Sequence, residues 1–450
     1  MSEPTEPSDS QRYPTLTDAG RRMLERLREH RHAPIYRNQS GNRLTAEDLA
    51  RVRAFEREVL AATVGPQREE SMPWLAEHLA RCYREVPFYR EMGGAPGHLS
   101  DVPTVSRAEL GQDIARFVPD SAPLERLINF RTSGTTGHPL LIASHPVVAA
   151  SYLAFHRRAL SRFGVALQAG SGDVGLVLLG FQQKCFTYVS VTPTLGEAGL
   201  AKINLHPNDW RDPDDRRKYL EDLAPEVLAG DPISFVELLK LQPSLTPRAV
   251  LSTSMTLLPG LRAELEAAFA CPVVDLYSLN EAGPVAAYDA ARDGHVLLQH
   301  CMLVEVVDGE GRALPAGSRG EVTLTGGFNF CLPLLRYRTG DFASLELRAG
   351  EPVLVGLEGR APVRFRTAAG DWLNNIEVTH ALNPLGLRQF HLHQAADGSL
   401  QLRVLGADRH EPELRQALTA LFGRQQALEI AELGAVEGKL TQYTSELAER

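Results

Sequence analysis

The sequence lacks the features that mark several specialised classes of protein. Its five cysteines are widely spaced and form no CxxC pair, which argues against a disulfide framework and a simple zinc knuckle. No apolar run approaches the ~18 residues that suggest a membrane span. The opening MSEPTEPSDS has neither the basic nor the apolar region of a secretory signal. These absences predict a reduced, cytoplasmic protein without a membrane partner.

Basic residues are fewer than acidic ones. Lys and Arg number 47 against 56 Asp and Glu, which gives a formal net charge of −9. Nucleic acids and anionic membranes favour a basic surface, so we expect neither as a partner. The 450 residues, of which 43% are hydrophobic and 23% charged, suffice for a substantial core and for more than one domain.

The first ninety residues have helical periodicity. In LTDAGRRMLERLREH and LTAEDLARVRAFEREVLAATV, apolar residues recur at intervals of three and four. The second residue of each stretch is a threonine, Thr17 or Thr45, that is placed to cap a helix. A third stretch of this kind is stopped by Pro87.

Strands and helices alternate further along the chain. VGLVLLGF (174–181) and FTYVSVTP (186–193) are typical of buried strands, and EVLAGDPISFVELLKL (226–241) combines a strand, a turn and a helix. This alternation predicts an α/β fold with mostly parallel sheets flanked by helices. From residue 295 to 347 the pattern shortens to hairpins, which predicts a β-rich subdomain.

A change of composition near Arg360 predicts a domain boundary. The stretch that follows contains short strands and one helix, which fits a small α+β domain of ~90 residues. We therefore divide the chain into domains at residues 1–360 and 361–450.

The loop in RTSGTTGHPLLI (131–142) is the first functional signal. Its hydroxyls can donate hydrogen bonds, and its glycines allow backbone N–H groups to converge on an oxyanion. The loop would suit the polyphosphate of a nucleotide, although it is not of the Walker type because GxxxxGK[ST] is absent. Short runs of Ser, Thr and Gly are also common in plain turns, so the loop alone leaves both interpretations open.

Three further stretches carry candidate site residues. DLYSLNEAG sets Tyr277 and Glu281 four residues apart after a predicted strand. LPLLRYRTGDF ends in a turn at Asp341, whose carboxylate is suited to vicinal hydroxyls. EGKLTQY presents Lys439 in a loop near the C-terminus. Each has a plain alternative: a helix-start carboxylate for Glu281, a turn former for Asp341, and an ordinary loop lysine for Lys439.

In this order the motifs resemble those of the adenylate-forming enzymes, in particular the phenylacetate–coenzyme A ligase branch. The resemblance runs from about Leu75 onward and includes REVPFYREM, DVPTVSRAEL and EVLAGDP. It implies a large N-terminal AMP-binding domain, a small mobile C-terminal lid, and a site between them. It also implies ATP-dependent activation of a small aromatic carboxylic acid to an acyl-adenylate, followed by transfer to coenzyme A, with ATP, Mg²⁺ and coenzyme A taking part.

The resemblance further implies roles for single residues. Glu281 would hold Mg²⁺, and Tyr277 would cover the adenine ring. Asp341, with Arg360 nearby, would bind the ribose hydroxyls. Lys439 would reach the carboxylate and the α-phosphate during adenylation.

The remaining implied nucleotide contacts fall in two turns and in the segment after Tyr277. The hydroxyl-rich loop would bind the β- and γ-phosphates, with Thr136 counted among the catalytic residues, and a second turn would lie beside the adenine. These positions are Ser133, Gly134, Thr135, Thr136, Gly137, Ser252, Thr253, Ser254, Ser278 and Asn280.

The chain departs from the family pattern at several positions. Where the loop often carries a lysine it has His138 and Leu140, so the phosphate charge has to be neutralised elsewhere, with Arg131 as one candidate. The hinge position that usually bears Asp is Val363, and Gly370 is the best counterpart of the thioester-channel glycine. These departures weaken the prediction of thioester formation more than that of adenylation.

Two other functions therefore stay open. The enzyme could pass its acyl group to a carrier protein or an amine, or the chain could be a non-catalytic nucleotide-binding regulator. Relatives in this branch are often dimers, which adds a homodimer to the expectations.

Two weaker groups of residues complete the prediction. Aromatic residues that could line an acyl pocket, although strand aromatics are core by default, are Phe181, Phe186 and Tyr188. His300 and Cys301 follow His295 closely, but such groups are more often surface residues than metal ligands.

Overall fold

The computed structural model describes residues 8–131, 140–359, 363–434, 436 and 440–447. The predicted N-terminal helices are confirmed: the Thr17 side chain accepts from Gly20 N and the Thr45 side chain from Asp48 N, and Pro87 starts a new short helix. The helices of this region are α1 (Asp9–Arg12), α2 (Asp18–Glu29), α3 (Ala46–Ala61), α4 (Leu75–Glu85), α5 (Pro87–Arg90) and α6 (Arg107–Gln112).

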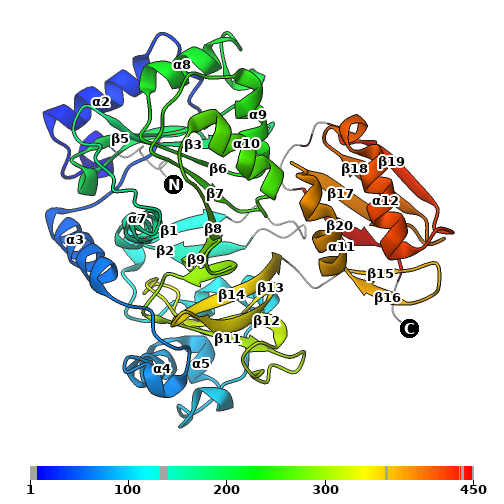
Figure 1. Ribbon diagram of the computed structural model, residues 1–450. Helices are drawn as coiled ribbons and strands as arrows, with labels where there is room; N and C mark the ends of the chain where they lie inside the picture. Colours follow the sequence, from blue (N-terminus) through cyan, green and yellow to red (C-terminus); the bar gives the residue numbers. More distant parts are fainter. Residues whose placement is uncertain (1–7, 132–139, 360–362, 435, 437–439, 448–450) are drawn as a thin grey trace, which may run out of the picture.

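One large sheet organises most of the chain (Figure 1). Its strands are β3 (Val174–Gly180), β4 (Tyr188–Thr192), β5 (Ala198–Asn204), β6 (Val227–Gly230), β7 (Ala249–Thr253), β8 (Val273–Leu279), β9 (Gly283–Asp289), β10 (Gly294–Leu297), β11 (Met302–Val307), β12 (Arg319–Gly326), β13 (Leu334–Arg348) and β14 (Glu351–Gly359). The order within the described residues is β11-β12-β13-β14-β10-β9-β8-β7-β6-β3-β5-β4. β5, β3, β6, β7 and β8 are mutually parallel, and the other neighbours are antiparallel.

Helices cover both faces of the parallel part of the sheet. They include α7 (Pro146–Ser161), α8 (Asp215–Leu223), α9 (Pro232–Leu241) and α10 (Pro259–Phe269). α2, α8, α9 and α10 bury residues such as Leu27 and Phe235 against one face, and α3 and α7 bury Val59 and Phe155 against the other. Strands covered on both sides are apolar throughout, and all of Val227–Gly230 is buried. No described helix has the length and apolarity needed to cross a membrane.

The predicted α/β class is confirmed, and the structure adds how its two parts are joined. The parallel strands and the hairpin-rich region are parts of the same sheet, because β8 pairs antiparallel with β9 and the later hairpins extend from there. α4, α5 and α6 pack on this antiparallel part around residues such as Tyr89 and Tyr337.

The C-terminal region has a sheet and a core of its own. Its elements are β15 (Arg364–Arg366), β16 (Trp372–Asn374), α11 (Asn375–Leu382), β17 (Phe390–Gln394), β18 (Leu400–Val404), α12 (Glu411–Phe422), β19 (Leu428–Glu432) and β20 (Tyr443–Ser445). The sheet order is β19-β18-β17-β20, and residues such as Phe365 and Leu414 form the core. Leu258, just before α10, packs into this core. The predicted boundary at residue 360 lies outside the described residues and stays a prediction.

Candidate active site

The carboxyl ends of the parallel strands meet at one edge of the sheet, and several predicted site residues lie there. β6 ends at Gly230, β7 at Thr253 and β8 at Leu279. Ser252 on β7 pairs with Gly230 on one side and with Asp275 on the other. Open α/β sheets bind ligands outside such strand ends, so this edge is the natural place for a site.

The turn after β7 is strained. Ser254 has φ +73°, a left-handed conformation that costs about 1–2 kcal/mol for a residue with a side chain. Ser252 is fully buried, and its hydroxyl has no hydrogen-bond partner among the described residues. Buried polar groups are normally paired, so the Ser252 hydroxyl is the feature of this turn that calls for a partner. The binding role of Ser252, Thr253 and Ser254 remains a prediction.

Tyr277 and Asp341 meet across two strands that are far apart in the sequence. The Tyr277 hydroxyl on β8 donates to Asp341 Oδ2 on β13 at 2.7 Å. Burial, together with the Asp341 carboxylate, raises the pKa of Tyr277 well above its ordinary value, so the phenol keeps the proton that it donates. Asp341 is also paired with Gly359, the last residue of β14. The structure therefore brings two of the predicted residues together.

Glu281 lies just beyond β8 and is only 2% exposed. Arg107 Nη1 donates to Glu281 Oε1 at 2.5 Å, and the Tyr337 hydroxyl donates to the same oxygen at 2.9 Å. Burial and the Glu281 carboxylate raise the pKa of Tyr337 well above its ordinary value, so it remains a donor. The buried negative charge is thus compensated by one cation and one neutral hydroxyl.

A tight turn sets the direction in which Glu281 leaves the strand. Gly283 has φ +71°, and a Cβ at this position would lie 2.6 Å from ring atoms of Phe328. Only glycine combines that conformation with so close an approach. The Tyr152 hydroxyl of α7 donates to the carbonyl oxygen of the exposed Asn280 at 3.2 Å, which ties the turn to the helix.

Several predicted residues lie outside the described part of the chain. They are Ser133, Gly134, Thr135, Thr136, Gly137, His138, Arg360 and Lys439. The predicted phosphate loop is preceded by β1 (Ile128–Arg131) and followed by β2 (Leu141–Ser144). The two strands pair antiparallel, with Arg131 opposite Leu141 and Ile128 opposite Ser144. Gly370 lies in the turn between β15 and β16 with φ +94°.

The three aromatic residues predicted for an acyl pocket occupy different positions. Phe181 directly follows β3, and its ring centroid lies 5.5 Å from that of His206. Phe186 is 53% exposed, and Tyr188 lies on β4 at the edge of the sheet. Phe181 therefore fits a ligand site at the strand ends better than the other two do.

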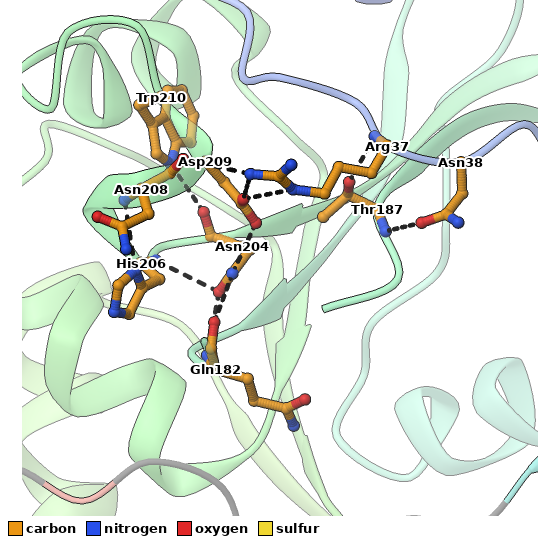
Figure 2. A network of polar contacts seen from close by, with 9 residues as sticks. All are labelled: Arg37, Asn38, Gln182, Thr187, Asn204, His206, Asn208, Asp209 and Trp210. Carbon is orange, nitrogen blue, oxygen red and sulfur yellow. Dashed lines mark hydrogen bonds and ion pairs between the residues drawn. The ribbon is translucent and has the colours of Figure 1, made fainter. Parts of the chain in front are cut away.

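Figure 2 shows a polar network that fixes the chain after β3. The buried Asn204 donates from Nδ2 to Gln182 O and to Asp209 Oδ2, both at 2.7 Å, and Asn204 Oδ1 accepts from Gln182 N. Arg37 Nε donates to Asp209 Oδ1 at 2.8 Å. The network thus ties an N-terminal segment to the loop that begins at Phe181. No pattern in the sequence indicated it.

Sequence reasoning also missed Arg107 and Tyr337. Both lie in stretches that carry the family resemblance, but neither was assigned a role. A weak signal for Arg107 was available, because the Ser106–Glu109 capping box makes it the first residue of α6. Its contact with Glu281, 174 positions away, could not be inferred from that box.

Part of the chain is similar to a known enzyme family and to a known protein. Residues 114–330 match the model of a family described as AMP-binding enzyme. A phenylacetate-coenzyme A ligase of Aromatoleum evansii is 26% identical over 308 residues, which are 61% of this chain and 65% of that protein. The match therefore spans less than two thirds of the relative's length.

Solved structures share the fold. The postadenylation state of a 2-hydroxyisobutyryl-CoA ligase in complex with R3-HIB-AMP has a TM-score of 0.60 at 16% identity, covering 88% of this chain and 90% of that one. An open conformation of the same ligase with 2-HIB-AMP and CoA has a TM-score of 0.51 at 16% identity, covering 88% and 91%. At such identity the likeness concerns the fold.

Proposed function

We propose that the chain is an adenylate-forming, AMP-binding enzyme that activates a small carboxylic acid with ATP. The first product would be an acyl-adenylate. The acyl group would then pass to the thiol of coenzyme A, with release of AMP.

The hydrogen bond between Tyr277 and Asp341 is the observation that carries this proposal. The family resemblance assigns Tyr277 to the adenine and Asp341 to the ribose. Adenine and ribose are joined in one nucleoside, so the residues that bind them have to be neighbours. Here they are in direct contact at 2.7 Å, although they are 64 positions apart in the sequence.

The proposed chemistry has two steps. A carboxylate oxygen attacks the α-phosphorus of ATP, the new O–P bond forms, and pyrophosphate leaves with the electrons of the bond that breaks. The coenzyme A thiolate then attacks the acyl carbonyl, and AMP leaves. Both reactants of the first step are anions, so fixed positive charge is needed to stabilise the transition state. We assign that role to Lys439, as the resemblance implies.

We assign a Mg²⁺ ion to Glu281, as the resemblance implies. Magnesium prefers oxygen ligands and usually takes only one or two carboxylates from a protein, and Glu281 would hold it. When bound, the ion would offset the charge of the phosphates. Both observed contacts of Glu281 meet at Oε1, so Arg107 has to share or yield the carboxylate when a metal ion binds.

We further propose that the acid is aromatic. Two observations support this narrower proposal: the name of the Aromatoleum evansii relative, and the position of Phe181 directly after β3 at the ligand-binding edge of the sheet. An aromatic side chain there offers a flat apolar surface on which an aryl group can pack.

Pyrophosphate release with ATP, Mg²⁺ and a panel of aryl and short aliphatic acids tests the proposal. We expect acid-dependent release that falls by about 100-fold or more in Lys439→Ala. Lys240→Ala is the matched control, because Lys240 on α9 is exposed and pairs only with Glu237 of its own helix among the described residues, and it should match the wild type.

The same assay separates the alternatives. Formation of a thioester when coenzyme A is added supports coenzyme A as the acceptor, whereas adenylation without thioester favours a carrier protein or an amine. An absence of release with every acid, while ATP still binds, would replace the proposal with a nucleotide-binding regulator.

A further inference from the structure

Three side chains that are typical metal ligands meet outside the set assigned to the candidate active site. They are Glu58 in the last turn of α3, and His300 and Cys301 in the segment between β10 and β11. One ligand atom from each lies within 4.8 Å of the other two, and His300 Nε2 is 2.9 Å from Glu58 Oε1. Among the described residues this is the one group of three or more metal-ligating side chains so arranged.

The polar groups of this cluster do not all have partners within the described part of the protein. His300 Nδ1 is buried and has no hydrogen-bond partner among the described residues. Glu58 lies in the last turn of α3, which contains no basic residue, and a carboxylate there is repelled by the negative end of the helix dipole. A cation at the cluster would relieve this repulsion. The neighbouring His295 takes no part, since its Nε2 lies 3.7 Å from Asp275 Oδ2 instead.

We propose that Glu58, His300 and Cys301 bind one divalent metal ion of the zinc class. A thiolate, an imidazole and a carboxylate together suit Zn²⁺ or Co²⁺, whereas Mg²⁺ prefers oxygen ligands alone. Glu58 is 60% exposed, so solvent can supply the fourth ligand of a tetrahedral site. The site is distinct from the magnesium position proposed at Glu281, and it does not depend on the proposed reaction.

Metal binding changes the state of the thiol. The metal ligand is the thiolate rather than the thiol, so Cys301 has to lose its proton when it binds the ion. As the sulfur–metal bond forms, that proton leaves to solvent. The ion then links the end of α3 to the segment that precedes β11. It stabilises the fold because it binds the native state and not the unfolded chain.

Cobalt titration of the chelator-treated full-length protein tests the site. We expect one Co²⁺ per chain, with the near-ultraviolet charge-transfer band of a cobalt–thiolate bond. Zn²⁺ should displace the cobalt and remove the band, and Mg²⁺ should not. No ATP or acid is present, so failure of this test leaves the proposed reaction untouched.

Three variants identify the ligands. Even residues that only support a metal ligand contribute ~10–100-fold to affinity, so Cys301→Ser should abolish the band and weaken binding at least ~100-fold. Glu58→Gln disturbs no core because its side chain is exposed, and it should weaken binding at least ~10-fold. Cys185→Ser changes a cysteine outside the cluster and should bind like the wild type.

The proposal fails on any of three results. The first is the absence of the charge-transfer band in the wild type, and the second is its persistence in Cys301→Ser. The third is unchanged affinity in Glu58→Gln, whose folding can be verified by circular dichroism.

Discussion

At the scale of single residues, Glu281 places a negative charge where water scarcely reaches it. Arg107 and the Tyr337 hydroxyl compensate this charge by bonding to the same carboxylate oxygen. Removing one partner of a buried ion pair leaves an uncompensated charge, which costs far more than the loss of a surface pair. Arg107 should therefore matter to stability as well as to the site.

We expect Arg107→Gln to lower the free energy of unfolding by about 2–3 kcal/mol, less than for a fully buried pair because the Arg107 side chain is 36% exposed. Urea denaturation without nucleotide measures the loss. Arg312→Gln is the control: Arg312 is 72% exposed, and its pairs with Asp308 and Glu310 should be worth less than about 1 kcal/mol. Equal losses in both variants would contradict the importance of the Glu281 pair.

At the scale of elements, the turn between β8 and β9 decides where Glu281 points. This turn reverses the chain, so that β9 returns antiparallel beside β8. Gly283 makes the reversal possible through its positive φ and its contact with Phe328. The strain of the positive φ can be separated from the contact with Phe328. Some other glycines of the chain also have a positive φ, but a Cβ added to them would meet no neighbouring atom.

Gly283→Ala should lower the free energy of unfolding by about 2–4 kcal/mol, since it adds overpacking against Phe328 to the strain of a positive φ. Gly317→Ala, at φ +80° with no heavy atom within 4 Å of the added Cβ, carries the strain alone and should cost about 1–2 kcal/mol. Chemical denaturation of both variants gives the comparison. If the two losses are the same, the contact with Phe328 is unimportant.

At the scale of the whole molecule, the C-terminal region rests on the start of α10. Leu258 belongs to the C-terminal core, and a Cβ at Gly260 would lie 1.8 Å from the carbonyl oxygen of Gly386. Arg388 and Glu264 form an ion pair across the same contact at 3.4 Å. Figure 1 shows the C-terminal elements set to one side of the large sheet. The mobility of this region as a lid, which the family resemblance implies, remains a prediction.

Gly260→Ala should displace the C-terminal region from α10 while leaving both cores folded, because the new methyl group would clash with the backbone at Gly386. Hydrogen exchange measured by mass spectrometry should then be faster around residues 257–262 and 383–388. Gly309→Ala, in open space, should leave exchange there unchanged. The same exchange pattern in the two variants would show that this contact does not hold the C-terminal region in place.

Much of the fold and part of the site could be predicted because their signals are local. The threonine caps of α2 and α3, the apolar runs of the parallel strands and the hairpins after residue 295 each occupy a few consecutive residues, and the structure confirms them. The order of the motifs likewise pointed to the AMP-binding enzymes, whose family model matches residues 114–330. The roles of Ser133 to Gly137, Arg360 and Lys439 remain predictions.

The sequence by itself thus determined the α/β class, the helix starts and the motifs that carry the proposed chemistry, since each depends on neighbours along the chain. Only the tertiary structure decided that the two kinds of strand form one sheet, that Arg107 neutralises Glu281, and that Glu58 meets His300 and Cys301. The contacts of Arg107 with Glu281 and of Glu58 with His300 join residues 174 and 242 positions apart. They depend on how helices and strands pack in three dimensions, and no local pattern in the sequence predicts that packing.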